Sequence, residues 1–162
     1  MARKKNKAPG EKKPIVIKNR KASHDYHIEE TFETGIVLQG TEVKSIRMGN
    51  ASFTDTFAYI HKGEIWLKDL YIKEFDQGSY NNHDPRRERK LLLKRDEIRK
   101  IDRAINQKGV TLIPLRLYFA RGNAKIQLAL GRGKKQYDKR AAIAEKDQKR
   151  DMDRDIKRKY KV

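Results

Sequence analysis

The sequence predicts a mainly β fold with short helices, in which the strands close into an antiparallel barrel of the oligonucleotide-binding kind. Short runs of alternating apolar and polar residues, turn-forming residues between those runs, and few segments of helical period support this prediction. Five or six short strands interrupted by helices, within about a hundred residues, are typical of such a barrel. A β-sandwich is the alternative, but it has no natural place for a helix over residues 95–107.

The first long strand is predicted from Tyr26 to Leu38, with a bend at Gly35. Its apolar residues share one parity, namely Tyr26, Ile28, Phe32, Ile36 and Leu38. Glu33 has the opposite parity and is therefore expected to face outward. Residues 41–48 then show helical spacing and stop at Gly49, which predicts a short helix with a glycine just after its end.

The second half of the chain predicts two hairpins around one helix. Apolar runs over 53–60 and 64–72 meet at Lys62 and Gly63, a two-residue turn signal, and residues 77–85 have the composition of a loop. Isoleucines at helical spacing predict a helix over 95–107. Alternating residues on either side of the sequence RGNA then predict a second hairpin, up to residue 130.

The net charge of +18 lies mostly at the two ends of the chain. Residues 1–21 carry nine Lys and Arg against one acid, and residues 132–162 carry thirteen against six. We therefore expect a disordered basic arm over 1–14, the barrel over 15–130, and a basic tail over 131–162. The tail has too few apolar residues to pack alone, so coil or fraying helix is expected in the free protein. Basic ends are typical of proteins that bind nucleic acid, although they also coat membranes nonspecifically.

The residue inventory argues against an enzyme. There is no Cys, the four His show no paired ligand spacing, and nucleotide-binding and nucleophile motifs are absent, so no metal or other cofactor is expected. Glu29, Glu30 and Glu33 could suggest acid–base chemistry, but on a strand Glu29 and Glu33 point one way and Glu30 the other, which favours a solvated acidic strand face. No signal peptide or membrane span is predicted, which favours a cytoplasmic protein with neither a membrane partner nor a small-molecule substrate.

A basic cluster precedes a triple leucine in the middle of the chain. Arg86, Arg87, Arg89 and Lys90 come directly before residues 91–93, a pattern that can hold phosphates while a leucine packs on a base or sugar. A solvated charge run is the alternative.

Four motifs closely resemble the SsrA-binding protein family, also called small protein B. They are NRKASHDYHIEETFETGIVLQGTEVKSIR (19–47), NHDPRRERKLLL (82–93), KGVTLIPLRLYF (108–119) and GKKQYDKR (133–140). The resemblance implies a barrel that binds the tRNA-like domain of transfer-messenger RNA (tmRNA) and brings it to bacterial ribosomes stalled without a stop codon. It further implies contact with small-subunit rRNA, and with elongation factor Tu through tmRNA. An integral ribosomal protein and a nuclease are the alternatives.

The resemblance places the family's RNA contacts at Asn19, Glu33, Leu92 and Lys125. With the neighbouring cations, the residues expected to bind tmRNA are Asn19, Arg20, Lys21, Glu33, Arg87, Arg89, Lys90, Leu92 and Lys125. The family's tail is implied to become helical on the ribosome and to occupy the empty mRNA path. The tail residues expected to contact the ribosome are Arg132, Gly133, Lys134, Lys135, Tyr137, Asp138, Lys139, Arg140 and Ile156.

Overall fold

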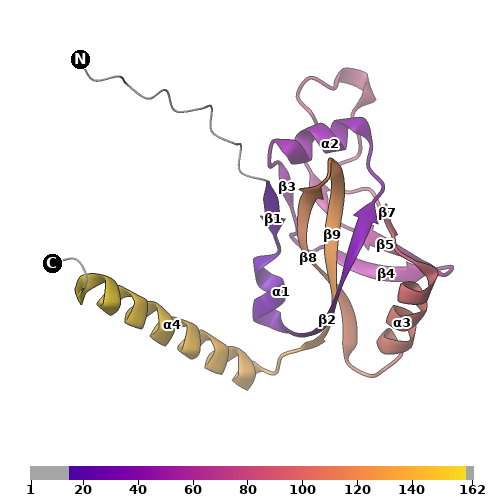
Figure 1. Cartoon of the computed structure of the whole chain (residues 1–162). Helices are drawn as coiled ribbons and strands as arrows, with labels where there is room; N and C mark the ends of the chain where they lie inside the picture. Colours follow the sequence, from indigo (N-terminus) through magenta and orange to yellow (C-terminus); the bar gives the residue numbers. More distant parts are fainter. Residues whose placement is uncertain (1–14, 160–162) are drawn as a thin grey trace, which may run out of the picture.

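The structure, a computed structural model, describes residues 15–159, apart from the side chains of residues 79, 136, 137, 139, 141, 142, 146 and 157–159 (Figure 1). The predicted arm over 1–14 lies outside the described residues. The strands are β1 (Val16–Lys18), β2 (Tyr26–Ile36), β3 (Ala51–Ser52), β4 (Phe57–His61), β5 (Glu64–Lys68), β6 (Tyr71–Ile72), β7 (Arg89–Leu92), β8 (Val110–Ala120) and β9 (Asn123–Gly133). The helices are α1 (Arg20–Asp25), α2 (Gly40–Arg47), α3 (Arg95–Ile105) and α4 (Gln136–Lys159), with a 3₁₀ turn η1 (Ser79–Asn81).

Seven strands form one antiparallel sheet in the order β1-β8-β9-β2-β7-β5-β4, and β3 pairs with β6 separately. The mainly β class with short helices is confirmed, but the prediction of a closed barrel is wrong because β1 and β4 remain unpaired edges. β1 has only three residues and the chain enters α1 after Asn19, whose N–H donates to Leu115 O at 2.7 Å. Little backbone is therefore left at this edge to pair with β4.

The core lies between the inner face of the sheet and the helices α2 and α3. Ile46 of α2 and Ile101 of α3 are fully buried against residues from the central strands, among them Leu67, Leu117 and Leu128. The short helix before Gly49 and the helix that begins at Arg95 are thus confirmed, the latter ending at Ile105. Helix α3 buries an apolar stripe, as its spacing predicted, whereas α2 buries Ile46 together with the polar Glu42 and Ser45.

Both predicted hairpins have two-residue turns in the left-handed backbone region. Lys62 and Gly63 join β4 to β5 with φ values of 51° and 74°, and Arg121 and Gly122 join β8 to β9 with 50° and 81°. Two consecutive positive φ values are typical of the type I′ turn, whose twist matches that of the flanking strands. The sequence located both turns correctly.

The first long strand keeps Glu33 outward, as predicted, but its apolar parity changes at a bulge. The β2–β9 register shifts between Ile28 and Glu30, so these residues face opposite sides of the sheet although both numbers are even. Phe32 and Ile36 point into the core, whereas Ile28 is 38% exposed. The single buried face predicted for Tyr26 to Leu38 is therefore wrong at Ile28.

The boundary between body and tail falls later than residue 130. Gly131, Arg132 and Gly133 continue β9 and pair with β2 and β8. Residues 136–159 then form a continuous helix, α4, whereas coil or fraying helix was predicted for the free protein. Acid–base pairs one turn apart support it, such as Asp147 with Arg150 at 3.5 Å and Asp151 with Arg154 at 3.3 Å.

Gly131→Ala is expected to destabilise the fold by about 1–3 kcal/mol, because the added methyl group would crowd its close neighbours. A Cβ at Gly131 would lie 2.9 Å from Ile113 Cδ1 and 3.0 Å from the His27 carbonyl oxygen. Gly133→Ala is the control, since no atom lies within 4 Å of its Cβ position. Urea denaturation measures both; equal free energies of unfolding for the two variants would contradict the close packing at Gly131.

Candidate nucleic-acid interface

The outer face of the sheet brings together residues from five strands in two adjacent rows. Strand register places Lys18, Arg116, Gln127 and Glu33 side by side in the first row. The second row runs across Val16, Tyr118, Lys125, Gly35 and Leu92. Because directly opposite residues of neighbouring strands share a face, both rows point away from the core. The face therefore combines cations, one acid, an aromatic ring and apolar side chains.

Glu33 is the acid in this face, and two neighbours hold its carboxylate. The Tyr118 hydroxyl donates a hydrogen bond to Glu33 Oε2, and Lys125 Nζ lies 3.4 Å from Oε1. The hydrogen bond from Tyr118, helped by Lys125, lowers the pKa of Glu33 below its ordinary value. The carboxylate is thus ionised at neutral pH and can accept hydrogen bonds from a ligand.

Tyr118 is half-buried in the same face, with the Arg116 guanidinium 4.9 Å from its ring centroid. Burial, followed by the hydrogen bond to Glu33, raises the pKa of the Tyr118 hydroxyl, which stays protonated as a donor. An aromatic ring beside an arginine plane is a common arrangement for stacking on bases.

Leu92 is 53% exposed at one end of the second row and lies over Gly35. A Cβ added to Gly35 would be 3.4 Å from Leu92 Cβ, so the glycine leaves the room that the leucine side chain fills. Leu92 and Lys125 also line a hollow of about 420 Å³ with Val43 and Phe119. The structure thus brings the predicted residues Glu33, Leu92 and Lys125 onto one surface.

Asn19 caps α1 and sets the direction of the two cations that follow it. Its side-chain oxygen accepts from Ala22 N at 3.3 Å, and its side-chain nitrogen donates to Pro114 O at 2.9 Å. Arg20 lines a hollow with Lys18 and Arg116, next to Glu33's row. Lys21 lines a different hollow. The structure therefore brings Arg20 to the sheet face, but not Lys21.

The start of the tail is fastened to α1 and β2. The Lys134 N–H donates to Asp25 O at 2.8 Å, and Lys134 Nζ donates to Ser23 O at 3.0 Å. Arg132 Nε donates to Glu29 Oε1 at 2.6 Å, and Asp138 accepts from the Lys135 N–H at 3.3 Å. These contacts orient α4, so Arg132, Lys134 and Asp138 already have partners within the chain.

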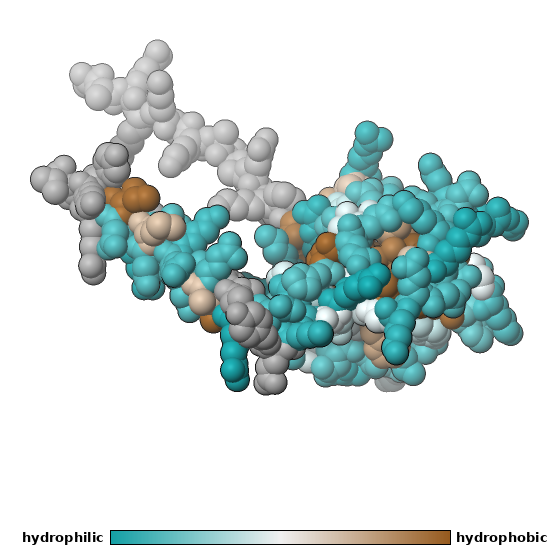
Figure 2. Space-filling model, turned by 90° about the horizontal axis from the view of Figure 1, so that it is seen from below, coloured by the Kyte–Doolittle hydropathy of each residue, from teal (hydrophilic) through white to brown (hydrophobic). Residues whose placement is uncertain are grey.

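Beyond its base, α4 projects from the body and is largely hydrophilic (Figures 1 and 2). Among its described side chains, the large apolar ones that are exposed are those of Ile143, Met152 and Ile156, at 46%, 61% and 54%. Arg140 is exposed as well, whereas the side chains of Tyr137 and Lys139 lie outside the described part of the chain. Met152 and Ile156 are four residues apart and therefore share one side of this otherwise charged helix, where they are available to a partner.

A family model described as "SmpB protein" matches residues 16–158. This chain belongs to the SmpB family. It is 53% identical over 158 residues to the SsrA-binding protein of Thermobifida fusca, covering 98% of this chain and 99% of that protein. It is 49% identical over 160 residues to the SsrA-binding protein of Staphylococcus epidermidis, covering 99% and 100%. A chain of the solved structure "tmRNA-SmpB: a journey to the center of the bacterial ribosome" is 54% identical, with a TM-score of 0.64 and coverage of 75% and 86%. The resemblance seen in the four motifs is confirmed.

Arg89 of this SmpB family member is wrongly predicted as an RNA contact, because its side chain is fully buried. Its guanidinium donates to Glu42 Oε1 at 2.8 Å and to the carbonyl oxygen of Leu70 at 2.7 Å. Arg87 binds the other oxygen of Glu42 at 2.6 Å and keeps 25% of its side chain exposed, so an RNA contact there stays a prediction. Lys90 pairs with Glu64 at the surface.

Two further observations concern other site types in this SmpB family member. Among residues 15–159, no group of three or more His, Cys, Asp or Glu side chains is arranged to hold a metal ion. Within the same residues, none of the helices combines the length and apolar character that crossing a bilayer requires.

The sequence did not lead to Lys18, Arg116 and Tyr118, which the structure places on the same face as Glu33. The signal was present for Arg116 and Tyr118. Both have the parity opposite to the buried Leu117, which places them on the other face of that strand. Lys18 carried no such signal, since a three-residue strand is too short to show alternation.

Proposed function

We propose that this chain binds the tRNA-like domain of tmRNA and delivers it to ribosomes stalled without a stop codon, with α4 occupying the empty mRNA path of the small subunit. Membership of the SmpB family carries the proposal, because the relatives are SsrA-binding proteins and the similar solved structure is of tmRNA and SmpB on the ribosome. The sheet face with Glu33, Leu92 and Lys125 supplies the chemistry that this function requires.

In this face, the cations contribute to affinity and Glu33 contributes to selectivity. Lys18, Arg20, Arg116 and Lys125 attract phosphates regardless of sequence. Glu33 repels phosphates, so its place among cations is useful only for accepting hydrogen bonds from base amino or imino groups. Leu92, beside its hollow, offers an apolar surface to a sugar or base.

In this proposal the protein is a cytoplasmic binding factor and not an enzyme, with elongation factor Tu reached through tmRNA. Residues 1–14 serve as a basic arm, residues 15–133 as the RNA-binding body, and the remainder as the ribosome-binding tail. Recovery of RNA with the tagged protein from its native host tests the assignment. A dominant RNA with an acceptor-stem end and an internal reading frame is expected; recovery of rRNA alone, in equal amounts with ribosomes, would instead favour an integral ribosomal protein.

Glu33→Ala is expected to weaken binding to tmRNA by roughly tenfold and binding to an unrelated RNA of equal length much less. The variant removes a base contact worth about 1–3 kcal/mol and no phosphate contact, so the salt dependence of the affinity should stay unchanged. Filter binding at several salt concentrations measures both quantities.

Lys125→Ala is the matched comparison, because it removes the cation beside the same carboxylate. It should weaken binding to both RNAs and lower the slope of log affinity against log salt concentration by about one. Equal losses on the two RNAs for Glu33→Ala would show that Glu33 acts through folding or general electrostatics, not through base recognition.

A further inference from the structure

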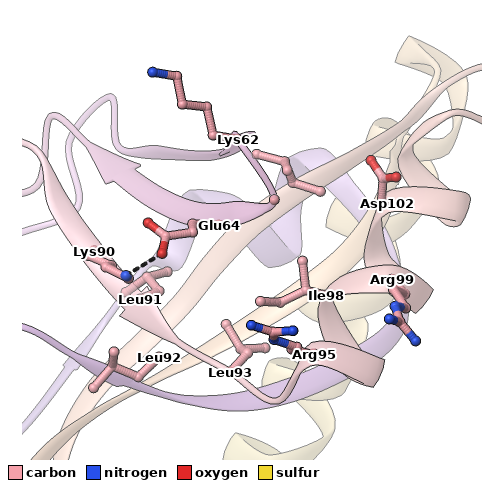
Figure 3. A pocket seen from close by; sticks show the side chains of 12 residues that line it. Lys62, Glu64, Lys90, Leu91, Leu92, Leu93, Arg95, Ile98, Arg99 and Asp102 are labelled. Atoms are coloured by element: carbon pink, nitrogen blue, oxygen red, sulfur yellow. Dashed lines mark hydrogen bonds and ion pairs between the residues drawn. The ribbon is translucent and has the colours of Figure 1, made fainter.

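A second hollow, of about 630 Å³, lies between the β4–β5 turn, β7 and α3 (Figure 3). It is separate from the face that holds Glu33, because it is bounded by β4, β5 and α3, which contribute nothing to the two rows. Leu92 is shared: it lies on the rim of this hollow and of the hollow beside Lys125. An RNA held by the sheet face can therefore continue across β7 into this space.

The floor of the hollow is apolar and accessible. Ile60, Leu93 and Ile98 are half-buried and line it, above the buried Leu91. A volume of a few hundred Å³ is typical of sites for small organic groups. A nucleobase offers the flat apolar faces that such a floor can cover.

The rim of the hollow is cationic, and two of its cations have no partner among the residues that the structure describes. Lys62, Arg95 and Arg99 are exposed around it, and the Arg95 guanidinium points into the space between Leu93 and Ile98 (Figure 3). In the part of the chain that the structure describes, neither Lys62 nor Arg95 has an ion-pair or side-chain hydrogen-bond partner.

The acids that line the hollow are too few to neutralise the positive charge of its rim. Glu64 is neutralised by Lys90, which leaves Asp102 as the other acid in the lining. Lys94, directly before α3, adds exposed positive charge. A polyanion thus fits the surroundings better than a neutral or basic peptide.

We propose that this hollow binds one unpaired nucleotide of an RNA, with its base against Leu93 and Ile98 and its phosphate held by Arg95. The flexible Lys62 side chain reaches this phosphate from the opposite rim. The proposal rests on the RNA-binding function proposed above and adds a contact that is independent of Glu33. An unpaired nucleotide is required, because a base within a duplex cannot reach a recessed apolar floor. The nucleotide belongs either to tmRNA or to ribosomal RNA, which share this chemistry.

The test uses the full chain and a fluorescent single-stranded hexanucleotide RNA, with a duplex of equal length as the second probe. Arg95→Ala is expected to lower the affinity for the single strand by roughly tenfold, the effect of losing one charge-assisted contact. Arg103→Ala is the matched control: it removes the same charge about 12 Å further along α3, beyond the Debye length of about 8 Å at physiological salt. Its affinity should change by less than about twofold. Lys62→Ala, in an exposed turn, should repeat the loss, and Arg95→Lys should restore part of it.

Equal losses for Arg95→Ala and Arg103→Ala, or an equal loss on the duplex, would overturn the proposal, since the charge would then act nonspecifically. Unchanged hexanucleotide binding in both Arg95→Ala and Lys62→Ala would also overturn it. Titrations with tmRNA and with isolated small subunits identify the source of the nucleotide. Two results distinguish this proposal from the proposed function. Failure of the unaltered chain to bind tmRNA rejects the proposed function. Hexanucleotide binding that is kept in Glu33→Ala and weakened in Arg95→Ala supports a nucleotide site in the hollow.

Discussion

Truncation after Lys135 is expected to abolish tagging on stalled ribosomes while changing the affinity for tmRNA by less than about tenfold. Residues 136–162 carry ten Lys and Arg against six acids, so their removal takes away some nonspecific attraction. The rows that hold Glu33 and Lys125 belong to strands that the truncation leaves intact. α4 would span about 36 Å, long enough to follow a channel through the small subunit.

Tagging activity and tmRNA affinity should be measured on the same preparations. A truncated chain that no longer binds tmRNA would contradict the separation of body from tail. Ile156→Pro tests the helix itself, because proline costs roughly 3 kcal/mol inside a helix and little in a coil. Ile156→Ala is its control, since it removes the apolar side chain and keeps the helix. Normal tagging by the proline variant would show that the tail acts as an unstructured polycation.

Glu42→Ala is expected to destabilise the body by about 3–5 kcal/mol, the range for breaking one side of a buried ion pair. Glu42 and Arg89 are both fully buried, and Arg87 covers them from the surface. Without the carboxylate, the Arg89 guanidinium would stay in the core with only carbonyl oxygens as partners. Against a typical domain stability of about 5–15 kcal/mol, this loss is a large share of the total.

Glu30→Ala is the matched control, because Glu30 pairs with Lys100 at the surface and such pairs contribute about 0–1 kcal/mol. Urea denaturation of both variants measures the difference. Similar free energies of unfolding for Glu42→Ala and Glu30→Ala would show that the buried pair contributes little.

Acid should reduce the difference between the unaltered chain and Glu42→Ala. Burial acts to raise the pKa of Glu42, but hydrogen bonds from Arg87, the Gln39 N–H and Arg89 together lower it below the ordinary value of 4.5. A group whose pKa is lower in the folded state stabilises the fold above its unfolded pKa and loses that contribution as the pH falls through the folded pKa. The stability gap should therefore be full above pH 4.5 and shrink below it.

Local patterns were sufficient for most of the secondary structure and for the family. Lys62–Gly63 and Arg121–Gly122 were found as turns because the residues that favour left-handed backbone stand next to the alternating strands. The helix beginning at Arg95 was found because its core contacts recur at helical spacing. The resemblance of the motifs pointed to Glu33, Leu92 and Lys125, which the structure brings onto one face, and the charge counts indicated a basic C-terminal segment.

Only the tertiary structure decided what those residues touch. Arg89 looked like its basic neighbours, but its partner Glu42 lies 47 residues earlier, and no local pattern reports a pairing of that separation. Ile28 turned outward because a bulge shifted the register against β9, which depends on both strands. Gly131, where the predicted tail begins, is required by the close approach of Ile113 and His27. The sequence alone determined the long strands, their two hairpin turns and the helices α2 and α3, since those depend on near neighbours. Burial, register and the assembly of Glu33, Tyr118 and Leu92 on one face depend on contacts between distant segments.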